Sequence, residues 1–239
     1  MPRILFLLLL LLASLIAGAQ PEPSVQLKQI DKDVWVHTSY KNYNGSLVGS
    51  NGLVVQTKQG LVLIDTPWDD DQTKALIQEL AKQFPKDKVT MALITHAHED
   101  RIGGIRTLLK NGTRVLSSSH TARLARQQGY PSPSVGLFDE AVMKIGKTKL
   151  NILFPGAGHS PDNMVIYLPK EEILFGGCLI KAKEATTLGN TADADLKQWP
   201  QSIKKVQQRF PEAKIVVPGH GSWGDSSLLS HTIELLSHY

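Results

Sequence analysis

The chain has 239 residues, of which 41% are hydrophobic and 20% are charged. This balance is typical of a globular protein and excludes intrinsic disorder, a collagen-like repeat and a coiled coil. The formal net charge is only +4 and the basic residues are scattered along the chain, so we do not expect nucleic acid as a partner.

The first 19 residues have the pattern of a secretory signal peptide. Arg3 supplies a positive charge, Ile4–Ile16 is an almost uninterrupted apolar run, and Ala17-Gly18-Ala19 resembles a cleavage site. The run is shorter than the roughly 20 residues that a membrane-spanning helix needs. We therefore expect residues 20–239 to form one domain that is released into the periplasm or secreted. We expect no stable membrane association after cleavage, and a monomer by default.

Cysteine is used once in the chain, at Cys178. A lone thiol in an oxidising compartment is a liability unless it is buried, paired with another chain or bound to something. Cys178 therefore requires an explanation from the rest of the sequence.

The elements expected after the signal begin with short β-branched runs separated by glycine and Asn-Gly turns, which predict antiparallel strands and hairpins. These runs are residues 34–37, 46–48, 52–55 and 61–64. The apolar spacing from Asp70 to Phe84 then predicts an amphipathic helix with aspartates at its start. A strand over Val89–Ile94 follows.

Helices and strands alternate in the rest of the chain. Helices are expected over residues 102–109, 121–127, 196–210 and 226–237, and strands over residues 149–154, 164–168, 172–175 and 214–217. No linker rich in Pro, Ser or Gly interrupts the pattern. The sequence predicts a compact α/β (α+β) domain, built of sheets with helices outside.

A histidine-rich motif follows the predicted strand Val89–Ile94. Because alternate residues of an extended segment point to one side, His96, His98 and Asp100 can converge. Imidazole nitrogens suit zinc, and a carboxylate can add an oxygen ligand. A solvated polar loop is the simpler interpretation, but three ligand types within five positions after a buried strand favour a metal site.

Three further ligand-type residues lie in glycine turns at the ends of predicted strands. They are His159, Cys178 and His220. Taken singly, each has an ordinary explanation as a turn residue or a small buried hydrophobe. With the first three they make six candidate ligands, enough for two zinc ions with three protein ligands each and open positions for water.

This set of residues closely resembles the metallo-β-lactamases, specifically the subclass with two zinc ions and a cysteine ligand (subclass B1). The resemblance extends from Val34-Trp35-Val36-His37 to Pro218-Gly219-His220-Gly221. The His-x-His-x-Asp element alone would indicate only the superfamily, whereas Cys178 and Lys181 narrow it to the subclass.

The resemblance implies a four-layer αβ/βα sandwich with two zinc ions along one edge. His96, His98 and His159 would bind the first ion, and Asp100, Cys178 and His220 the second. It also implies a secreted zinc-dependent β-lactamase that confers antibiotic resistance. A zinc-bound bridging hydroxide would attack the β-lactam amide of penicillins, cephalosporins and carbapenems.

Further roles follow from the resemblance alone. Lys181 would attract the substrate carboxylate, Asn190 would donate to the developing oxyanion, and Asp100 would also orient the hydroxide. Arg101 and Asp65 would support the ligands from behind. Substrate contacts are expected from Trp68, Tyr40 and Tyr43, the two tyrosines lying in a flap at residues 39–45. Without the resemblance, Lys181 would be a solvent-facing lysine and Asn190 a turn residue.

Two other classes of function remain open on the sequence. One is a hydrolase of the same fold that acts on thioesters, lactones or phosphodiesters. The other is a non-catalytic zinc carrier or sensor of the cell envelope, which would need no open position on its metal.

Overall fold

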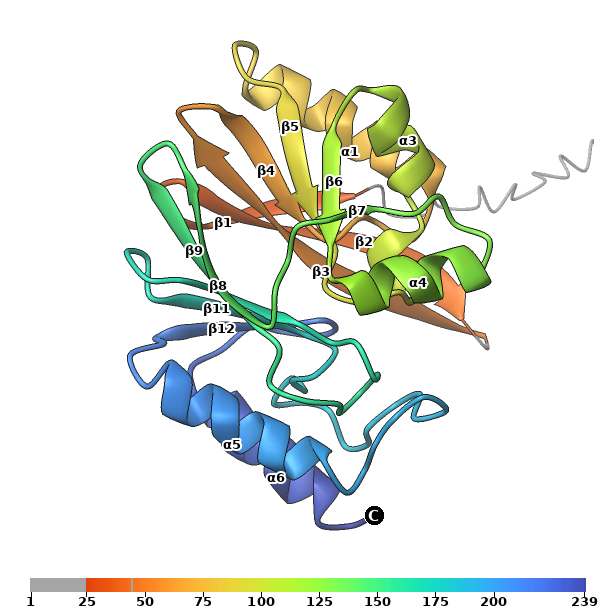
Figure 1. The fold of residues 1–239 in the computed structure, drawn as a ribbon, viewed down its shortest axis with the longest axis vertical. Helices are drawn as coiled ribbons and strands as arrows, with labels where there is room; N and C mark the ends of the chain where they lie inside the picture. Colours follow the sequence, from red (N-terminus) through yellow and green to blue (C-terminus); the bar gives the residue numbers. More distant parts are fainter. Residues whose placement is uncertain (1–24, 44) are drawn as a thin grey trace, which may run out of the picture.

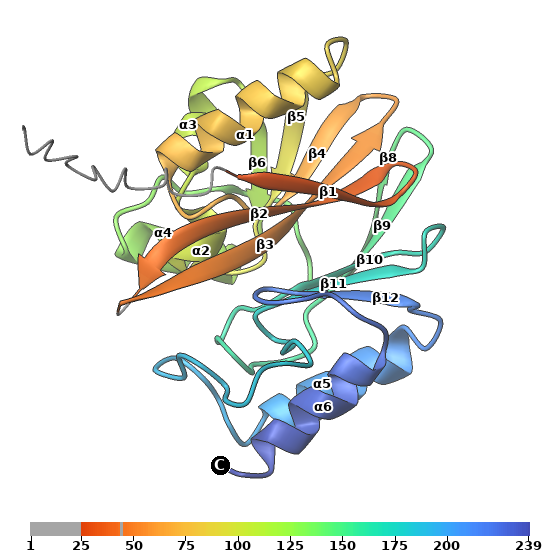
Figure 2. The same ribbon diagram turned by 180° about the vertical axis from the view of Figure 1, so that it is seen from behind.

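Two β-sheets lie face to face with helices on both outer sides (Figures 1 and 2). The structure is a computed structural model and describes residues 25–43 and 45–239. The predicted signal peptide, residues 1–19, lies outside the described residues. No helix among the described residues is both long and apolar enough to cross a bilayer.

The first sheet has seven strands in sequence order. They are β1 (Gln26–Asp31), β2 (Val34–Tyr43), β3 (Ser46–Thr57), β4 (Gly60–Ile64), β5 (Val89–Leu93), β6 (Arg114–Ser117) and β7 (Ser134–Val135). Strands β1 to β4 form an antiparallel meander, and β4 to β7 run parallel. The antiparallel half therefore supplies a long hairpin, and the parallel half supplies strand ends that point to one edge.

The second sheet has the strand order β12-β11-β10-β9-β8. Its strands are β8 (Glu140–Ile145), β9 (Thr148–Leu153), β10 (Val165–Leu168), β11 (Ile173–Gly177) and β12 (Ile215–Pro218). The pair β11–β12 is parallel, so the loops that follow these two strands leave the sheet side by side.

Helices cover the outer face of each sheet (Figures 1 and 2). The first sheet carries α1 (Asp70–Gln83), α2 (Glu99–Ile102), α3 (Ile105–Lys110) and α4 (Ser119–Gln127), and the second carries α5 (Trp199–Arg209) and α6 (Ser227–Leu236). Helix α1 begins where the side chain of Asp69 accepts the backbone N–H of Gln72 at 2.8 Å.

Apolar side chains form three clusters that separate the four layers. One lies between the sheets and includes Leu53, Ile166 and Phe175. The others lie between the first sheet and its helices, and between the second sheet and α5 and α6. This confirms the four-layer sandwich that the resemblance implied.

The predicted elements correspond closely to these strands and helices, with several differences. The runs at residues 46–48 and 52–55 belong to one strand, β3, and the predicted helix from Ile102 begins earlier, as α2 and then α3. Strands β1, β6, β7 and β8 were not predicted. They are short or carry exposed polar residues, so their apolar pattern is weak.

Candidate metal centre

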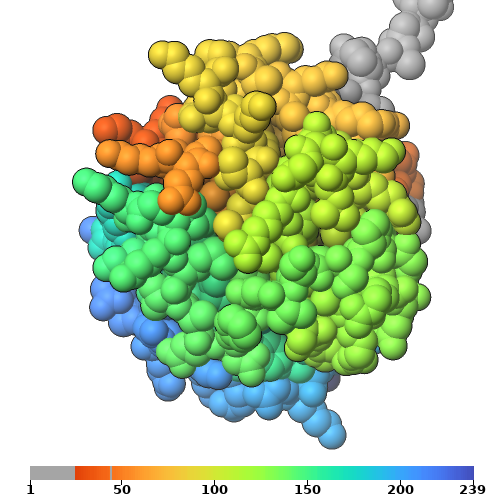
Figure 3. Space-filling view, turned by 45° about the horizontal axis from the view of Figure 1, so that its top comes forward, coloured from red at the N-terminus to blue at the C-terminus, as the bar shows by residue number. Residues whose placement is uncertain are grey.

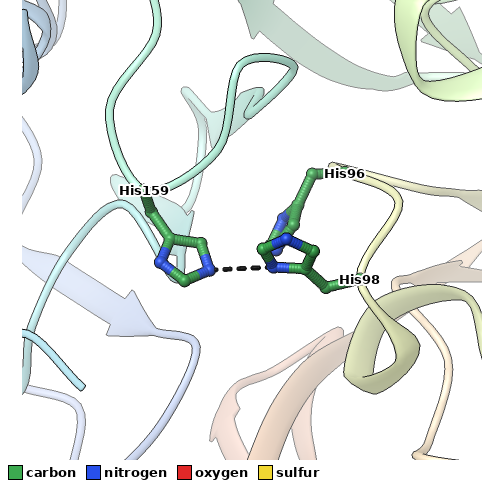
Figure 4. A group of neighbouring side chains, drawn as sticks. All are labelled: His96, His98 and His159. Carbon is green, nitrogen blue, oxygen red and sulfur yellow. Dashed lines mark hydrogen bonds between the residues drawn. The ribbon is translucent and has the colours of Figure 1, made fainter. Parts of the chain in front are cut away.

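Three histidines from two loops meet at one edge of the sandwich. His96 and His98 follow β5, and His159 lies between β9 and β10. Nδ1 of His98 lies 3.0 Å from Nε2 of His159, and the three ring centroids are 4.8 to 5.2 Å apart (Figure 4). The sequence-predicted grouping of these three side chains is therefore present in the structure.

The chemistry of the three rings fits a zinc ion. Burial lowers the pKa of His96 and of His159 well below the usual value, and neighbouring positive groups add to the shift. Both rings are therefore neutral and carry lone pairs. Nε2 of His96 is buried without a hydrogen-bond partner in the described part of the chain. Zinc binds neutral imidazole and would satisfy this nitrogen.

A second group lies beside the first and consists of Asp100, Cys178 and His220. Oδ2 of Asp100 is 3.1 Å from Nε2 of His220 and 3.5 Å from Sγ of Cys178, and Sγ is 3.4 Å from the same Nε2. His96 also lies within reach of Asp100 and Cys178. One carboxylate, one thiol and one imidazole at these separations form a donor set suited to zinc.

Charge is concentrated in this second group. Burial alone would lower the pKa of His220, but the nearby Cys178 and Asp100 outweigh it and raise that pKa to about 9. Burial opposes ionisation of Asp100, yet Arg101 and His220 hold its pKa well below the usual value. Asp100 is therefore ionised and can serve as a ligand for a metal cation.

The route by which Asp100 reaches the cluster differs from the predicted one. His98 has extended backbone and caps α2, whereas Asp100 lies within that short helix. His96 lies within reach of both of the others, but His98 and Asp100 belong to different groups, and the aspartate arrives through a helical turn and not through an extended loop.

Arg101 lies beneath the second group and is fully buried. Its Nε and Nη2 donate to Oδ2 of Asp100 at 3.0 and 2.7 Å, and Nη2 also donates to Oγ of Ser50 and the carbonyl of Gly219 at 2.9 Å each. Nη1 donates to the carbonyl of Asn51. The guanidinium thereby ties α2 to β3 and to the loop that carries His220.

Asp65 supports the first group through Thr95. Its Oδ1 accepts the Thr95 N–H at 2.7 Å, its Oδ2 accepts the Thr95 hydroxyl at 2.8 Å, and that hydroxyl lies 3.3 Å from Nδ1 of His96. The backbone of Asp65 is left-handed, with φ of 62°. A strained backbone beside a ligand loop is a feature of functional sites.

Lys181 and Asn190 differ in how far they are buried. Lys181 is only 9% exposed, its Nζ is 5.3 Å from the centre of the Trp199 ring, and burial lowers its pKa. Asn190 is exposed in the loop before α5, and its side-chain oxygen accepts the N–H of Ala192 at 3.0 Å. No hydrogen bond among the described residues joins Asn190 to the six candidate ligands.

The predicted flap forms the end of the β2–β3 hairpin. Tyr43 is exposed and stacks on Trp68 with 6.4 Å between ring centroids, and Trp68 in turn lies 6.2 Å from the ring of His220. Tyr40 donates its hydroxyl to Gln26 on β1 at 3.2 Å. Trp68 is largely buried, so Tyr43 presents the exposed aromatic surface here.

Three residues that support the histidines were missed by sequence reasoning. Oδ2 of Asp193 lies 3.0 Å from Nε2 of His98, Oδ2 of Asp162 accepts the Ala97 N–H at 3.0 Å, and Trp199 packs against His159. Asp193 lies in a polar loop with no pattern to mark it. Asp162 follows His159 in the glycine turn, and that proximity was the one available signal.

Comparison with known proteins identifies relatives along most of the chain. A family model described as "Metallo-beta-lactamase superfamily" matches residues 45–220. A protein named "Metallo-beta-lactamase type 2" from Bacillus sp. (strain 170) is 47% identical over 213 residues, which cover 89% of this chain and 82% of that protein.

Solved structures give the same result. A metallo-β-lactamase from Pontibacter korlensis superimposes with a TM-score of 0.87 at 47% identity, covering 90% of this chain and 100% of that one. The metallo-β-lactamase FIM-1 from Pseudomonas aeruginosa, solved in a mono-zinc form, gives a TM-score of 0.83 at 38% identity, covering 91% and 98%.

Proposed function

The chain belongs to the metallo-β-lactamase superfamily, and from this membership we propose that it is a zinc-dependent hydrolase of β-lactam antibiotics. The observation that carries the proposal is the pair of adjoining ligand groups, one of three histidines and one of Asp100, Cys178 and His220. We propose penicillins, cephalosporins and carbapenems as substrates, and antibiotic resistance as the consequence.

Two zinc ions would be held by these six side chains. When bound, zinc polarises a carbonyl oxygen and lowers the pKa of a coordinated water towards neutrality. The neutral ligands His96, His98 and His159 would leave the charge of their ion uncompensated, whereas Asp100 and Cys178 would nearly neutralise the charge of the other. Cys178 binds metal as a thiolate, which explains a lone cysteine in an exported chain.

The protein's own residues set the geometry around these ions. Arg101 fixes Oδ2 of Asp100 and compensates the negative charge that Asp100 and Cys178 bring into a buried site. Asp65 and Thr95 orient His96, and Asp193 orients His98. Hydrogen-bonded partners behind metal ligands commonly decide both metal affinity and activity.

Substrate contacts are proposed for a few residues around the clusters. The ammonium of Lys181 would attract the carboxylate that β-lactams carry beside the strained ring, and Asn190 would donate to the developing oxyanion. Tyr43, stacked on Trp68 at the end of the β2–β3 hairpin, supplies exposed aromatic surface for the apolar parts of a substrate. The side-chain oxygen of Asn190 already accepts the N–H of Ala192, so its amide N–H is the group that would donate.

Export to the periplasm and a monomeric state are also proposals. The apolar segment within residues 1–19 supports export, and the mature domain would then be residues 20–239. Processing at Ala19 is tested by N-terminal sequencing of the protein from the periplasmic fraction, and oligomeric state by light scattering.

The proposed reaction is tested with a chromogenic cephalosporin. We expect hydrolysis that is lost on chelation and restored by zinc, and that is strongly reduced in Cys178→Ser. Ser226→Ala, at an exposed position preceding α6, is the matched control. A folded, zinc-loaded chain without turnover would favour a zinc carrier instead, and wild-type turnover in Cys178→Ser would remove the second zinc from the mechanism.

A further inference from the structure

A cavity with a volume of about 730 Å³ has none of the six candidate ligands in its lining. We call it the rear pocket. Its walls come from the start of α4, from the β7–β8 connection, and from the loops after β9 and before β10. It is lined by Ser118, Ser119, His120, Val135, Leu137, Phe138, Asp139, Glu140, Phe154, Asp162 and Met164.

The rear pocket lies where the chain crosses from the first sheet to the second. In Figure 1 the segment between β7 and β8 makes this crossing beside α4. In Figure 3 the green segments around residues 110–150 spread across the middle of one face, between the orange and yellow part of the chain and the blue part. A ligand held here would contact both halves of the sandwich.

The lining combines apolar walls with acidic groups. Leu137, Phe138 and Phe154 contribute apolar surface, and Phe138 is 63% exposed. Glu140 is paired with Arg209 at 2.8 Å, but Asp139 makes no ion pair among the described residues. None of the lining residues is a lysine or an arginine, although the chain as a whole is positively charged. The charge of the rear pocket is therefore complementary to a cation.

Asp162 adds an observation that points to a ligand. Its side chain is almost completely buried, and Oδ2 accepts the N–H of Ala97 at 3.0 Å. The other oxygen, Oδ1, has no hydrogen-bond donor in the part of the chain that the structure describes. Oδ1 is not one of the buried side-chain atoms that lack a partner, so it is open to solvent. Water or a cationic group in the rear pocket can therefore donate to it.

We propose that the rear pocket binds a small organic cation, with one ammonium or amidinium group attached to an aromatic or branched aliphatic body. The cationic group donates to Asp162 and Asp139, and the apolar body packs on Leu137, Phe138 and Phe154. The volume lies within the range of about 300–1,000 Å³ that is usual for small-molecule sites.

Two hydrogen bonds link the lining of the rear pocket to the metal loop, one from the Met164 N–H to the carbonyl of Thr95 at 3.0 Å and one to Asp162. Asp162 holds the N–H of Ala97, and Ala97 lies between His96 and His98. A cation that donates a hydrogen bond to the Asp162 carboxylate weakens the hydrogen bond from the Ala97 N–H to Asp162, because both donors share one negative charge. Occupation of the pocket should therefore be visible at the Ala97 amide.

The test is a titration of the zinc-loaded, ¹⁵N-labelled protein with 2-phenylethylamine, followed by amide chemical shifts. We expect saturable shifts at Ala97 and along residues 135–140. The neutral analogue 2-phenylethanol should bind about tenfold more weakly, because it lacks the charge-assisted bond. The anion 3-phenylpropionate should produce no shifts in these residues. Equal binding of the amine and the alcohol would overturn the proposal.

Variants at the rim locate the binding site without disturbing the core. Asp139→Asn and Phe138→Ser change exposed side chains and should each weaken binding of the amine severalfold, and Ser119→Trp should block the cavity. Val142→Ser, at an exposed apolar position outside the lining, is the matched control. Unchanged binding in Ser119→Trp would overturn the proposal.

Competition with a zinc-binding thiol inhibitor distinguishes amine binding in the rear pocket from amine binding at the metal centre. Amine binding should persist when the inhibitor is present, whereas mutual exclusion would place the amine on the zinc ions and overturn the proposal. Since the readout requires no turnover, failure here is distinguishable from failure of the proposed hydrolysis.

Discussion

Arg101 and Asp100 are neighbours in sequence, and Nε and Nη2 of Arg101 both donate hydrogen bonds to Oδ2 of Asp100, at 3.0 and 2.7 Å. The same oxygen lies 3.1 Å from Nε2 of His220. Oδ2 of Asp100 thus contacts both the buried guanidinium of Arg101 and the ring of His220. The orientation of Asp100 therefore depends on the planar geometry of that guanidinium.

Replacing Arg101 by lysine tests that dependence. A lysine retains the charge but cannot reach Asp100, Ser50 and Gly219 in one planar fork, so Asp100 loses its fixed orientation. We expect zinc affinity to fall about 10- to 100-fold. Competition with a chromophoric chelator measures it, and Arg123→Lys on the exposed face of α4 is the control. Unchanged affinity would show that charge alone suffices.

Asp65→Asn tests the support of His96. The amide retains the size of the carboxylate but removes its charge and one of the two acceptors that hold Thr95. We expect kcat to fall about 10- to 100-fold and zinc to bind more weakly. Asp71→Asn, on the exposed start of α1, should match the wild type because surface ion pairs contribute little. A variant with full activity and full zinc affinity would remove Asp65 from the site.

Lys181→Ala should raise KM more than it lowers kcat. A lysine that holds a remote carboxylate contributes binding that is similar in the ground state and the transition state. The neighbouring exposed Lys183→Ala is the matched control. For a substrate whose carboxylate is esterified, the wild type and Lys181→Ala should have the same KM. If KM of the free acid is unchanged in the variant, Lys181 does not contact substrate.

His37→Leu tests a buried histidine outside the site. Neither ring nitrogen of His37 has a well-formed hydrogen bond among the described residues. Burial lowers its pKa to about 4, the charge of Arg101 adds to the shift, and backbone groups of Asp65 and Ile64 oppose it without reversing it. The folded chain therefore resists protonation that the unfolded chain accepts below about pH 6.5.

The sign of the pH effect follows from that depressed value. The contribution of neutral His37 to stability is complete above about pH 6.5 and is lost as the pH falls towards 4, by on the order of 3 kcal/mol. Urea unfolding of metal-free protein between pH 7 and 4 should show a shallower loss in His37→Leu than in the wild type. His238→Leu, at an exposed position, should retain the wild-type slope. Identical slopes for all three would contradict the prediction.

The candidate ligands could be picked out from sequence because His96, His98 and Asp100 form a motif after a buried strand, and His159, Cys178 and His220 lie in glycine turns at strand ends. Parallel strands such as β11 and β12 deliver Cys178 and His220 to the same edge, so local patterns were enough to place them. The four-layer arrangement came from the family resemblance, since periodicity alone does not say which sheet faces which.

Long-range supporting contacts were not predictable. Arg101 was expected behind the ligands, but its partners Ser50 and Asn51 lie on β3, about fifty positions earlier. Asp193 meets His98 across 95 positions from an irregular loop. Such contacts depend on how two sheets pack against each other, and neither apolar spacing nor turn residues encode that packing.

The six candidate ligands come from both halves of the sandwich, and this has a consequence for the lifetime of the protein. His96, His98 and Asp100 follow the first sheet, whereas His159, Cys178 and His220 belong to loops of the second. Bound zinc would thus cross-link the halves, adding stability in proportion to the logarithm of its free concentration. Where zinc is scarce, the chain would open more readily to proteases, so metal supply would govern abundance as well as turnover.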